Sequence, residues 1–201
     1  TPNSPFGPAV GGFFYSNRWK ISMAKRPQVS AVTPPATAAY AWLQKPDEGQ
    51  EYSDGKYKVT ILMPKDDKST VDFITKMTPL VEDLAIKEFG KLPSGFKYPW
   101  KDGDDTSKDE FKDHWMMVAK SKYLPGYVDV SKKPVAIEDA PMSGDLVRLA
   151  TVFGAYSAGG AKGVSAQLRN VMLVERRNKS GDAFAEIEAA ESADAEDDFD
   201  I

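Results

Sequence analysis

The segment KYKVTILMP, residues 56–64, alternates apolar and polar side chains and forms the clearest amphipathic strand pattern in the chain. One face is apolar and the other polar: Tyr57, Val59, Ile61 and Met63 against Lys56, Lys58 and Thr60. Successive side chains of a strand point to opposite faces, so one face of this strand requires a core and the other meets solvent. The chain is therefore expected to fold around a half-buried β-sheet.

The periodicity changes directly after this strand. Between residues 69 and 90, apolar residues recur at spacings of three and four, which predicts a helix with one buried face. Ser69 or Thr70 can cap its start, Gly90 can end it, and Pro79 is the point at which it can bend.

The remaining pattern is that of a strand-rich domain. Residues 91–113 are mostly loop, and five further segments read as strands: 36–44, 114–123, 127–130, 145–157 and 163–175. A strand pair, an inserted helix and then strands in hairpin order predict a mainly β fold. The specific prediction is an OB-type five-stranded barrel with an inserted helix and long loops.

Length and composition favour one domain with appendages. Residues 1–30 are interpreted as an N-terminal arm or extension, 31–178 as the OB-fold domain, and 179–201 as an acidic C-terminal tail that is expected to be disordered.

Several kinds of chemistry are disfavoured by composition. The chain has no cysteine and a single histidine, His114, so thiolate metal sites, cysteine nucleophiles and the usual zinc sites are not expected. We predict no enzyme activity, no cofactor and no bound metal. No stretch approaches the roughly 18 apolar residues that cross a bilayer, so no membrane association is expected and an intracellular protein is the default.

Charge is distributed unevenly. Residues 182–201 contain nine acidic residues and no Lys or Arg; subtracting nine from 30 acids leaves 21 against 26 bases, so residues 1–181 carry about +5. The chain ends in AEDDFDI, where Phe199 and Ile201 interrupt and follow the acidic run. A purely solvating tail gains nothing from large apolar groups, so this end is interpreted as an interaction tail.

The polar faces of the predicted strands suggest a ligand. Arg148, Arg169 and Tyr156 lie on polar faces, and Lys120 and Lys122 share a side. Cations and flat rings on the outside of a barrel suit a single nucleic-acid strand, since phosphates bind Lys and Arg and unpaired bases stack on aromatic rings. Each residue taken alone can equally be a solvated or core side chain.

The sequence also resembles the single-stranded-DNA-binding proteins of tailed bacteriophages, particularly those of podoviruses. The resemblance runs from about Val32 to Glu175 and resumes at the tail; it rests on VTPPATAAYAWLQKPDE, DGKYKVTILMPKDD, YPWKDGDD, HWMMVAKSKYLPGYVD, SGDLVRLATVFGAYSAGGAKGVSAQLRNVMLVE and AEDDFDI. It implies an OB fold that coats and protects single-stranded DNA in phage DNA replication and recombination, in the cytoplasm of the infected bacterium. It also implies a tail that recruits a DNA polymerase, helicase or primase.

The resemblance suggests which residues bind DNA and which bind partners. The stacking candidates are Tyr40, Trp42, Trp100, Trp115, Tyr123 and Tyr156. The phosphate-binding candidates are Lys56, Lys58, Lys120, Lys122, Arg148, Lys162 and Arg169. The partner-binding tail consists of Asp197, Asp198, Phe199, Asp200 and Ile201. Trp42 and Trp115 can equally be core residues, and residues 157–163 are expected to form a hairpin loop.

Alternative functions remain open from sequence. The carboxylates of residues 102–105, DGDD, could hold magnesium in a nuclease, although no Glu or His partner stands at an evident spacing. An RNA-binding or adaptor OB-fold protein is the other alternative, because stacking and phosphate contacts do not distinguish DNA from RNA. A homodimer is also possible.

Overall fold

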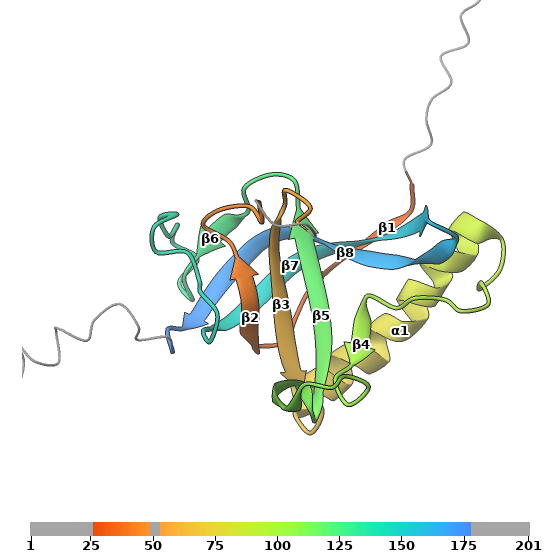
Figure 1. Ribbon diagram of the computed structural model, residues 1–201, viewed down its shortest axis with the longest axis horizontal. Helices are drawn as coiled ribbons and strands as arrows, with labels where there is room; N and C mark the ends of the chain where they lie inside the picture. The colour runs from red at the N-terminus through yellow and green to blue at the C-terminus, as the bar shows by residue number, and fades with distance from the viewer. Residues whose placement is uncertain (1–25, 49–52, 178–201) are drawn as a thin grey trace, which may run out of the picture.

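The computed structural model describes residues 26–48 and 53–177 (Figure 1). In chain order the elements are β1 (Gln28–Val32), β2 (Ala36–Trp42), β3 (Tyr57–Pro64), α1 (Lys68–Phe89), β4 (Trp100–Asp102), the 3₁₀ turn η1 (Asp109–Phe111), β5 (His114–Ser121), β6 (Gly126–Val128), β7 (Leu146–Ala158) and β8 (Ala161–Glu175). The predicted acidic tail and most of the predicted N-terminal arm lie outside the described residues.

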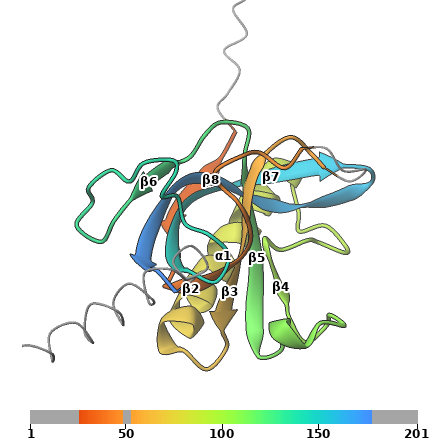
Figure 2. The same cartoon turned by 60° about the vertical axis from the view of Figure 1, so that its left-hand side comes forward.

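All the described strands belong to one sheet with the order β1-β7-β2-β3-β5-β8-β6, and β4 pairs with β5. An additional β7–β8 pairing joins the two halves of this order, so β7, β2, β3, β5 and β8 form a closed ring of hydrogen-bonded neighbours. Figure 2 shows the strands curving around to bring β8 and β7 together. The fold is mainly β-sheet with one helix, consistent with an OB-like fold.

The β3 strand follows the predicted alternation only in part, because Thr60, which was expected on the solvent face, is only 8% exposed. Val59, Ile61 and Met63 are fully buried in the core, while Lys58 remains partly exposed on the opposite face. Antiparallel partners on both sides, β2 and β5, satisfy its backbone groups. The amphipathic pattern therefore places β3 in the middle of the sheet, with one face on the core.

The helix α1 begins one residue earlier than predicted and has a different cap. Asp67, not Ser69 or Thr70, is the N-cap, and its carboxylate accepts a hydrogen bond from the Ser69 amide. A carboxylate at this position satisfies a free amide and also lies at the positive end of the helix dipole. Gly90 ends the helix at φ 80°, as predicted.

One face of α1 packs on the ring. Met77, Val81, Leu84 and Ala85 are buried, and the helix contacts β1, β7 and β8. Within residues 26–48 and 53–177, no helix combines the length and the apolar character that a membrane crossing requires.

An irregularity in β2 determines which of its rings face outward. Ala36 and Ala38 point into the core, and strict alternation would place Tyr40 and Trp42 on the same inner side. The register with β3 shifts between Ala39 and Trp42, so β2 accommodates one extra residue there. Such a bulge re-aims the residues that follow it. Tyr40 adopts φ 49°, and the two rings become 45% and 36% exposed.

Three short elements were not predicted. β1 pairs along β7 from Gln28, so the sheet starts three residues before the predicted domain boundary at residue 31. β4 and η1 lie within residues 91–113, which were predicted to be mostly loop. β4 and η1 have three residues each and are too short to show a period, whereas the five residues of β1 alternate between exposed and partly buried positions.

A β7–β8 hairpin lies at residues 157–163 as predicted, but its turn is only two residues long, and residues 157, 158 and 161–163 are paired within the strands. Gly159 and Gly160 both have positive φ in the two-residue turn, a conformation that glycine adopts without strain. Next to the turn, Gly163 approaches the backbone of Lys97, and the Val164 amide donates to the Lys97 carbonyl at 3.0 Å. This contact fixes the chain directly before Tyr98 and Pro99.

We expect Gly163→Ala to destabilise the fold by about 1–3 kcal/mol, the usual range for an overpacked site. A Cβ at residue 163 would lie 2.4 Å from the Lys97 carbonyl oxygen, which is backbone and cannot rotate away. Gly154→Ala is the matched control, because its Cβ would have no neighbour closer than 3.9 Å. Urea denaturation that gives the two variants equal unfolding free energies would contradict this account of the contact.

Candidate nucleic-acid interface

Two adjoining hollows form one groove on the outward side of the sheet. The first, of about 570 Å³, lies over β5 and β8, and the second, of about 790 Å³, lies over β2, β3 and β5. Four residues line both hollows: Pro99, Val118, Lys120 and Tyr156. We call the two hollows together the groove.

Strand register places a row of polar and aromatic side chains across the groove. Trp42 of β2 is opposite Lys58 of β3, Lys58 is opposite Lys120 of β5, and Lys120 is opposite Gln167 of β8. All four line the groove. Since opposite residues of paired strands share a face, the sheet itself sets their spacing.

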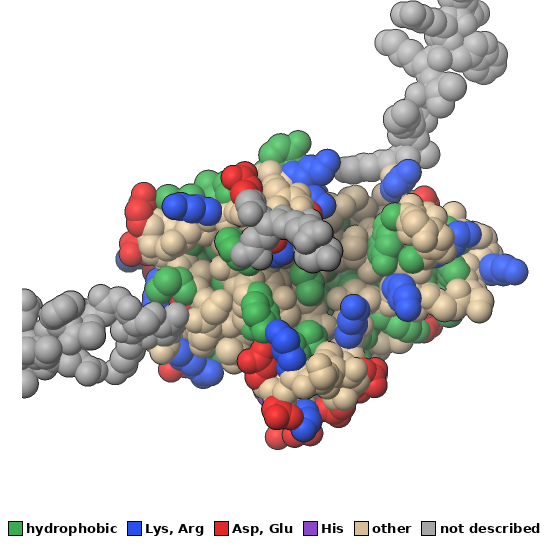
Figure 3. Space-filling model, in the orientation of Figure 1, with side chains coloured by type: hydrophobic (Ala, Val, Ile, Leu, Met, Phe, Trp, Pro, Cys, Tyr) green, Lys and Arg blue, Asp and Glu red, His purple; other side chains and the backbone are tan. Residues whose placement is uncertain are grey.

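Nine of the thirteen predicted DNA-binding residues line the groove: Tyr40, Trp42, Lys56, Lys58, Lys120, Lys122, Tyr123, Tyr156 and Arg169. Tyr123 is 79% exposed, so its ring is largely free to contact a ligand. In Figure 3, which views the molecule from the side of β2, β3 and β5, Lys and Arg side chains are interspersed with hydrophobic ones. The groove thus combines cations with flat rings.

Three groove lysines are already paired with carboxylates from the β2–β3 connection. Lys58 contacts Asp47, whereas Lys120 and Lys56 contact Asp54 at 2.7 and 3.6 Å. The hydrogen bond from Lys120 lowers the pKa of Asp54, with smaller contributions from the charges of Lys120, Lys56 and Lys58. The groove cations are therefore partly neutralised when no ligand is bound.

Among the aromatic and basic residues that line the groove, sequence reasoning missed two, Tyr98 and Lys101. The Tyr98 hydroxyl donates to Glu82 of α1, and its ring stacks on Trp100 at 5.9 Å between centroids. The Glu82 hydrogen bond, with burial, raises the pKa of Tyr98 to about 12. Both residues belong to the short YPWK stretch around β4, and the signal that could have found them is its aromatic and basic composition.

Two predicted stacking residues belong to the core side instead. Trp100 is 6% exposed and packs edge-on against Phe153 and Phe73 at centroid distances of 6.5 and 6.4 Å. Trp115 is two residues before Met117, so both point to the inner face of β5, and it packs against the core cluster. Neither ring lines the groove: burial of Trp100 speaks against its stacking on a base, and Trp115 packs on the core, the alternative that the sequence also allowed.

Two predicted phosphate-binding residues lie away from the groove. Arg148 donates from Nε to the Thr33 carbonyl at 3.0 Å, which ties β7 to the segment after β1. Lys162 lies 5.2 Å from the centroid of the Phe89 ring at the end of α1. The five predicted tail residues, Asp197 to Ile201, fall outside the described part of the chain.

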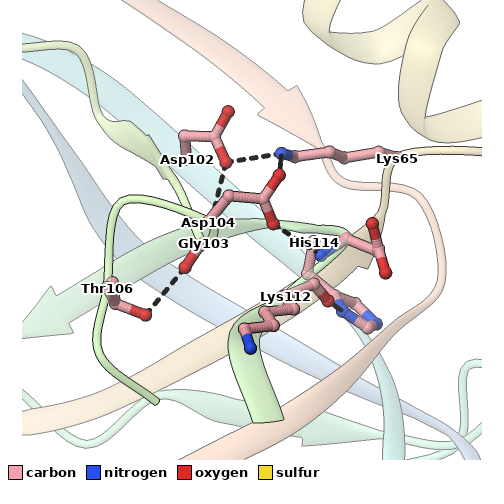
Figure 4. A network of polar contacts seen from close by, with 8 residues as sticks. Lys65, Asp102, Gly103, Asp104, Thr106, Lys112 and His114 are labelled. Carbon is pink, nitrogen blue, oxygen red and sulfur yellow. Dashed lines mark hydrogen bonds and ion pairs between the residues drawn. The ribbon is translucent and has the colours of Figure 1, made fainter. Parts of the chain in front are cut away.

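The DGDD cluster organises a loop (Figure 4). Lys65 donates to both Asp102 and Asp104 at 2.5 Å, and the Asp104 carboxylate also accepts from the Asp113 amide at 2.8 Å. The Lys65 hydrogen bonds lower the pKa of both carboxyl groups. Within the described ranges, no group of three or more His, Cys, Asp or Glu residues is placed to hold a metal ion. The carboxylates thus serve the loop between β4 and β5.

A sequence model of the family described as Enterobacter phage Enc34, ssDNA-binding protein, matches residues 29–200. The chain belongs to this family. The match to the Enc34-type family confirms the resemblance to phage single-stranded-DNA-binding proteins, and it extends through the acidic end of the chain. No curated protein matches the sequence.

Solved structures of phage proteins share the fold of this Enc34-type chain. The single-stranded DNA-binding protein from bacteriophage Enc34 is similar with a TM-score of 0.61 and 20% identity, covering 81% of this chain and 89% of that one. The same protein in complex with ssDNA is similar with a TM-score of 0.60 and 20% identity, covering 73% of this chain and 86% of that one. The structure of gp2.5, a single-stranded DNA binding protein encoded by bacteriophage T7, is similar with a TM-score of 0.57 and 22% identity. The match covers 80% of this chain and 98% of that one.

Proposed function

We propose that the protein binds single-stranded DNA along the groove and thereby coats and protects it during phage DNA replication and recombination. The observation that carries this proposal is the row formed by Trp42, Lys58, Lys120 and Gln167 across four strands. Membership of the Enc34-type family supports it. The ring of five strands would then be an OB-type barrel, whose outer face and loops are suited to oligonucleotides.

The groove suits an unpaired strand because its rings need exposed base faces. Bases would stack on Trp42, Tyr123 and Tyr156, while Lys120 and Lys122 would meet phosphates between them. In a duplex the base faces are already stacked on each other, so only the phosphate contacts would remain. Binding is the whole of the proposed activity, with no catalytic residue, and it would take place in the cytoplasm of the infected bacterium.

We expect single-stranded DNA to bind more tightly than duplex, and Lys120→Ala to weaken binding to the single strand by about fivefold. The loss of one phosphate contact should also reduce the slope of log affinity against log salt by about 0.7. Lys68→Ala is the matched control, since Lys68 is 87% exposed and pairs with Asp72 on α1. Fluorescence anisotropy at several salt concentrations measures both quantities.

Tighter binding to duplex would remove the proposal. If Lys120→Ala and Lys68→Ala change the affinity for single-stranded DNA equally, with unchanged circular dichroism, the binding site does not lie in the groove.

Asp54 provides a second test, because its carboxylate occupies a position next to the groove cations. We expect Asp54→Asn to tighten single-stranded DNA binding about three- to tenfold at low salt, with a smaller gain at high salt, since screening weakens charge effects. Asp72→Asn removes an equal charge from α1 and should leave affinity unchanged. Unchanged affinity in Asp54→Asn would mean that Asp54 does not oppose phosphate binding.

The acidic end of the chain is proposed to recruit replication proteins, namely a DNA polymerase, helicase or primase. Phe199→Ala with Ile201→Ala keeps every charge but removes two apolar anchors, so capture of the polymerase of the same phage should fall at least tenfold while DNA affinity stays constant. Phe184→Ala with Ile187→Ala is the matched control, in the same acidic segment. If both double variants capture the polymerase equally in a pull-down, Phe199 and Ile201 are not the apolar anchors of the tail.

A further inference from the structure

Tyr40 reaches the groove through an unfavourable backbone conformation. Its φ of 49° lies in the left-handed region, which a bulky residue seldom occupies. The extra residue that β2 accommodates between Ala39 and Trp42 is what turns the ring from the core side to the groove side. Strained conformations of this kind persist only where the surroundings hold them, and they cluster at functional sites.

The loop between β4 and β5 holds the Tyr40 ring from three directions. Its hydroxyl donates to Glu110 at 2.8 Å and accepts from Lys108 at 2.5 Å. The Lys108 ammonium lies 4.6 Å from the ring centroid, beside the hydroxyl end of the ring, and the Tyr40 and Phe111 rings meet edge to face at 6.1 Å between centroids. The hydrogen bond to Tyr40 is the main cause of a raised pKa at Lys108.

These contacts are poorly explained by stability alone. Tyr40 is 45% exposed, and Lys108 and Glu110 are exposed, so their polar contacts compete with water and contribute little to folding. Phe111, by contrast, is buried and anchors η1 next to the Tyr40 ring. A buried anchor with two exposed polar partners keeps the ring in one orientation while leaving much of its surface open.

We propose that Lys108 and Glu110 are positioning residues, which hold Tyr40 as the platform on which one unpaired base stacks at the β2 end of the groove. This inference rests on the proposed single-stranded DNA binding and adds a specific role for the loop between β4 and β5. Tyr40 is 45% exposed, so part of its ring surface remains open to a base. A ring fixed before the ligand arrives loses little conformational freedom when the base stacks on it.

The test is photo-crosslinking with a single-stranded oligonucleotide that contains 5-bromodeoxyuridine at every position. Irradiation links the base to an aromatic side chain that stacks on it, and peptide mass spectrometry locates the link. The oligonucleotide is present at saturating concentration, so differences in affinity do not enter. The measured quantity is the crosslink at Tyr40 as a fraction of all crosslinks, which a general loss of stability would not change selectively.

We expect the wild-type chain to crosslink at Tyr40, and Lys108→Met combined with Glu110→Ala to reduce that fraction about fivefold, the lower end of what one stacked base contributes. The single variant Glu110→Gln should keep most of the wild-type crosslinked fraction at Tyr40, because the side-chain carbonyl oxygen of Gln still accepts a hydrogen bond from the Tyr40 hydroxyl. Lys112→Met is the matched control, since this lysine of the same loop pairs with Asp109 instead.

Three other outcomes are distinguishable, and each overturns a different part of the proposal. An unchanged fraction in the double variant, with unchanged circular dichroism, overturns the positioning role. Crosslinks elsewhere in the groove but none at Tyr40 in the wild type overturn the stacking platform and leave the proposed function standing. The absence of saturable single-stranded DNA binding by the wild type overturns the proposed function and this inference with it.

Discussion

The long antiparallel pairing of β7 with β8 is the interaction on which the architecture depends. It runs from Leu146 and Glu175 to Ala158 and Ala161, and it joins what would otherwise be two distant parts of one sheet. A closed ring has an inside and an outside, and the inside is filled by apolar side chains from its strands and α1. Core side chains occupy the inside, and the groove lies on the outer face of the ring.

Most strands of the fold could be predicted from the alternation of apolar and polar residues. Counting residues along a strand, odd or even, could also have shown which candidate site residues face inward. In β5, Lys120 lies on the outer face, so Trp115, an odd number of residues away, falls on the inner face with Met117. The same counting fails in β2, where the extra residue before Trp42 reverses the parity without a mark in the sequence. Trp100 could not be placed either, because a three-residue strand shows no period.

The two aspartates that pair with groove lysines, Asp47 and Asp54, differ in what they do for the molecule. The Asp47 side chain is 8% exposed, its backbone amide donates to the Lys56 carbonyl, and its carboxylate holds Lys58, so this pair is part of the β2–β3 connection. A buried carboxylate that lost its cation would be strongly destabilising. Lys120 is 43% exposed and its partner Asp54 27%, which makes that pair the easier one to exchange for a phosphate. Burial thus divides the groove cations into structural and available ones.

The ring is not equally strong all the way around. Two register pairs join β2 to β7 and two join β5 to β8, whereas the pairings within β2–β3–β5 and within β7–β8 are longer. The molecule is therefore two stiff halves connected by two short seams. Lys120 and Gln167 face each other across the β5–β8 seam, in the middle of the groove. A ligand that binds both strands would, by mass action, stabilise the closed ring against opening at this seam, one of its two short ones.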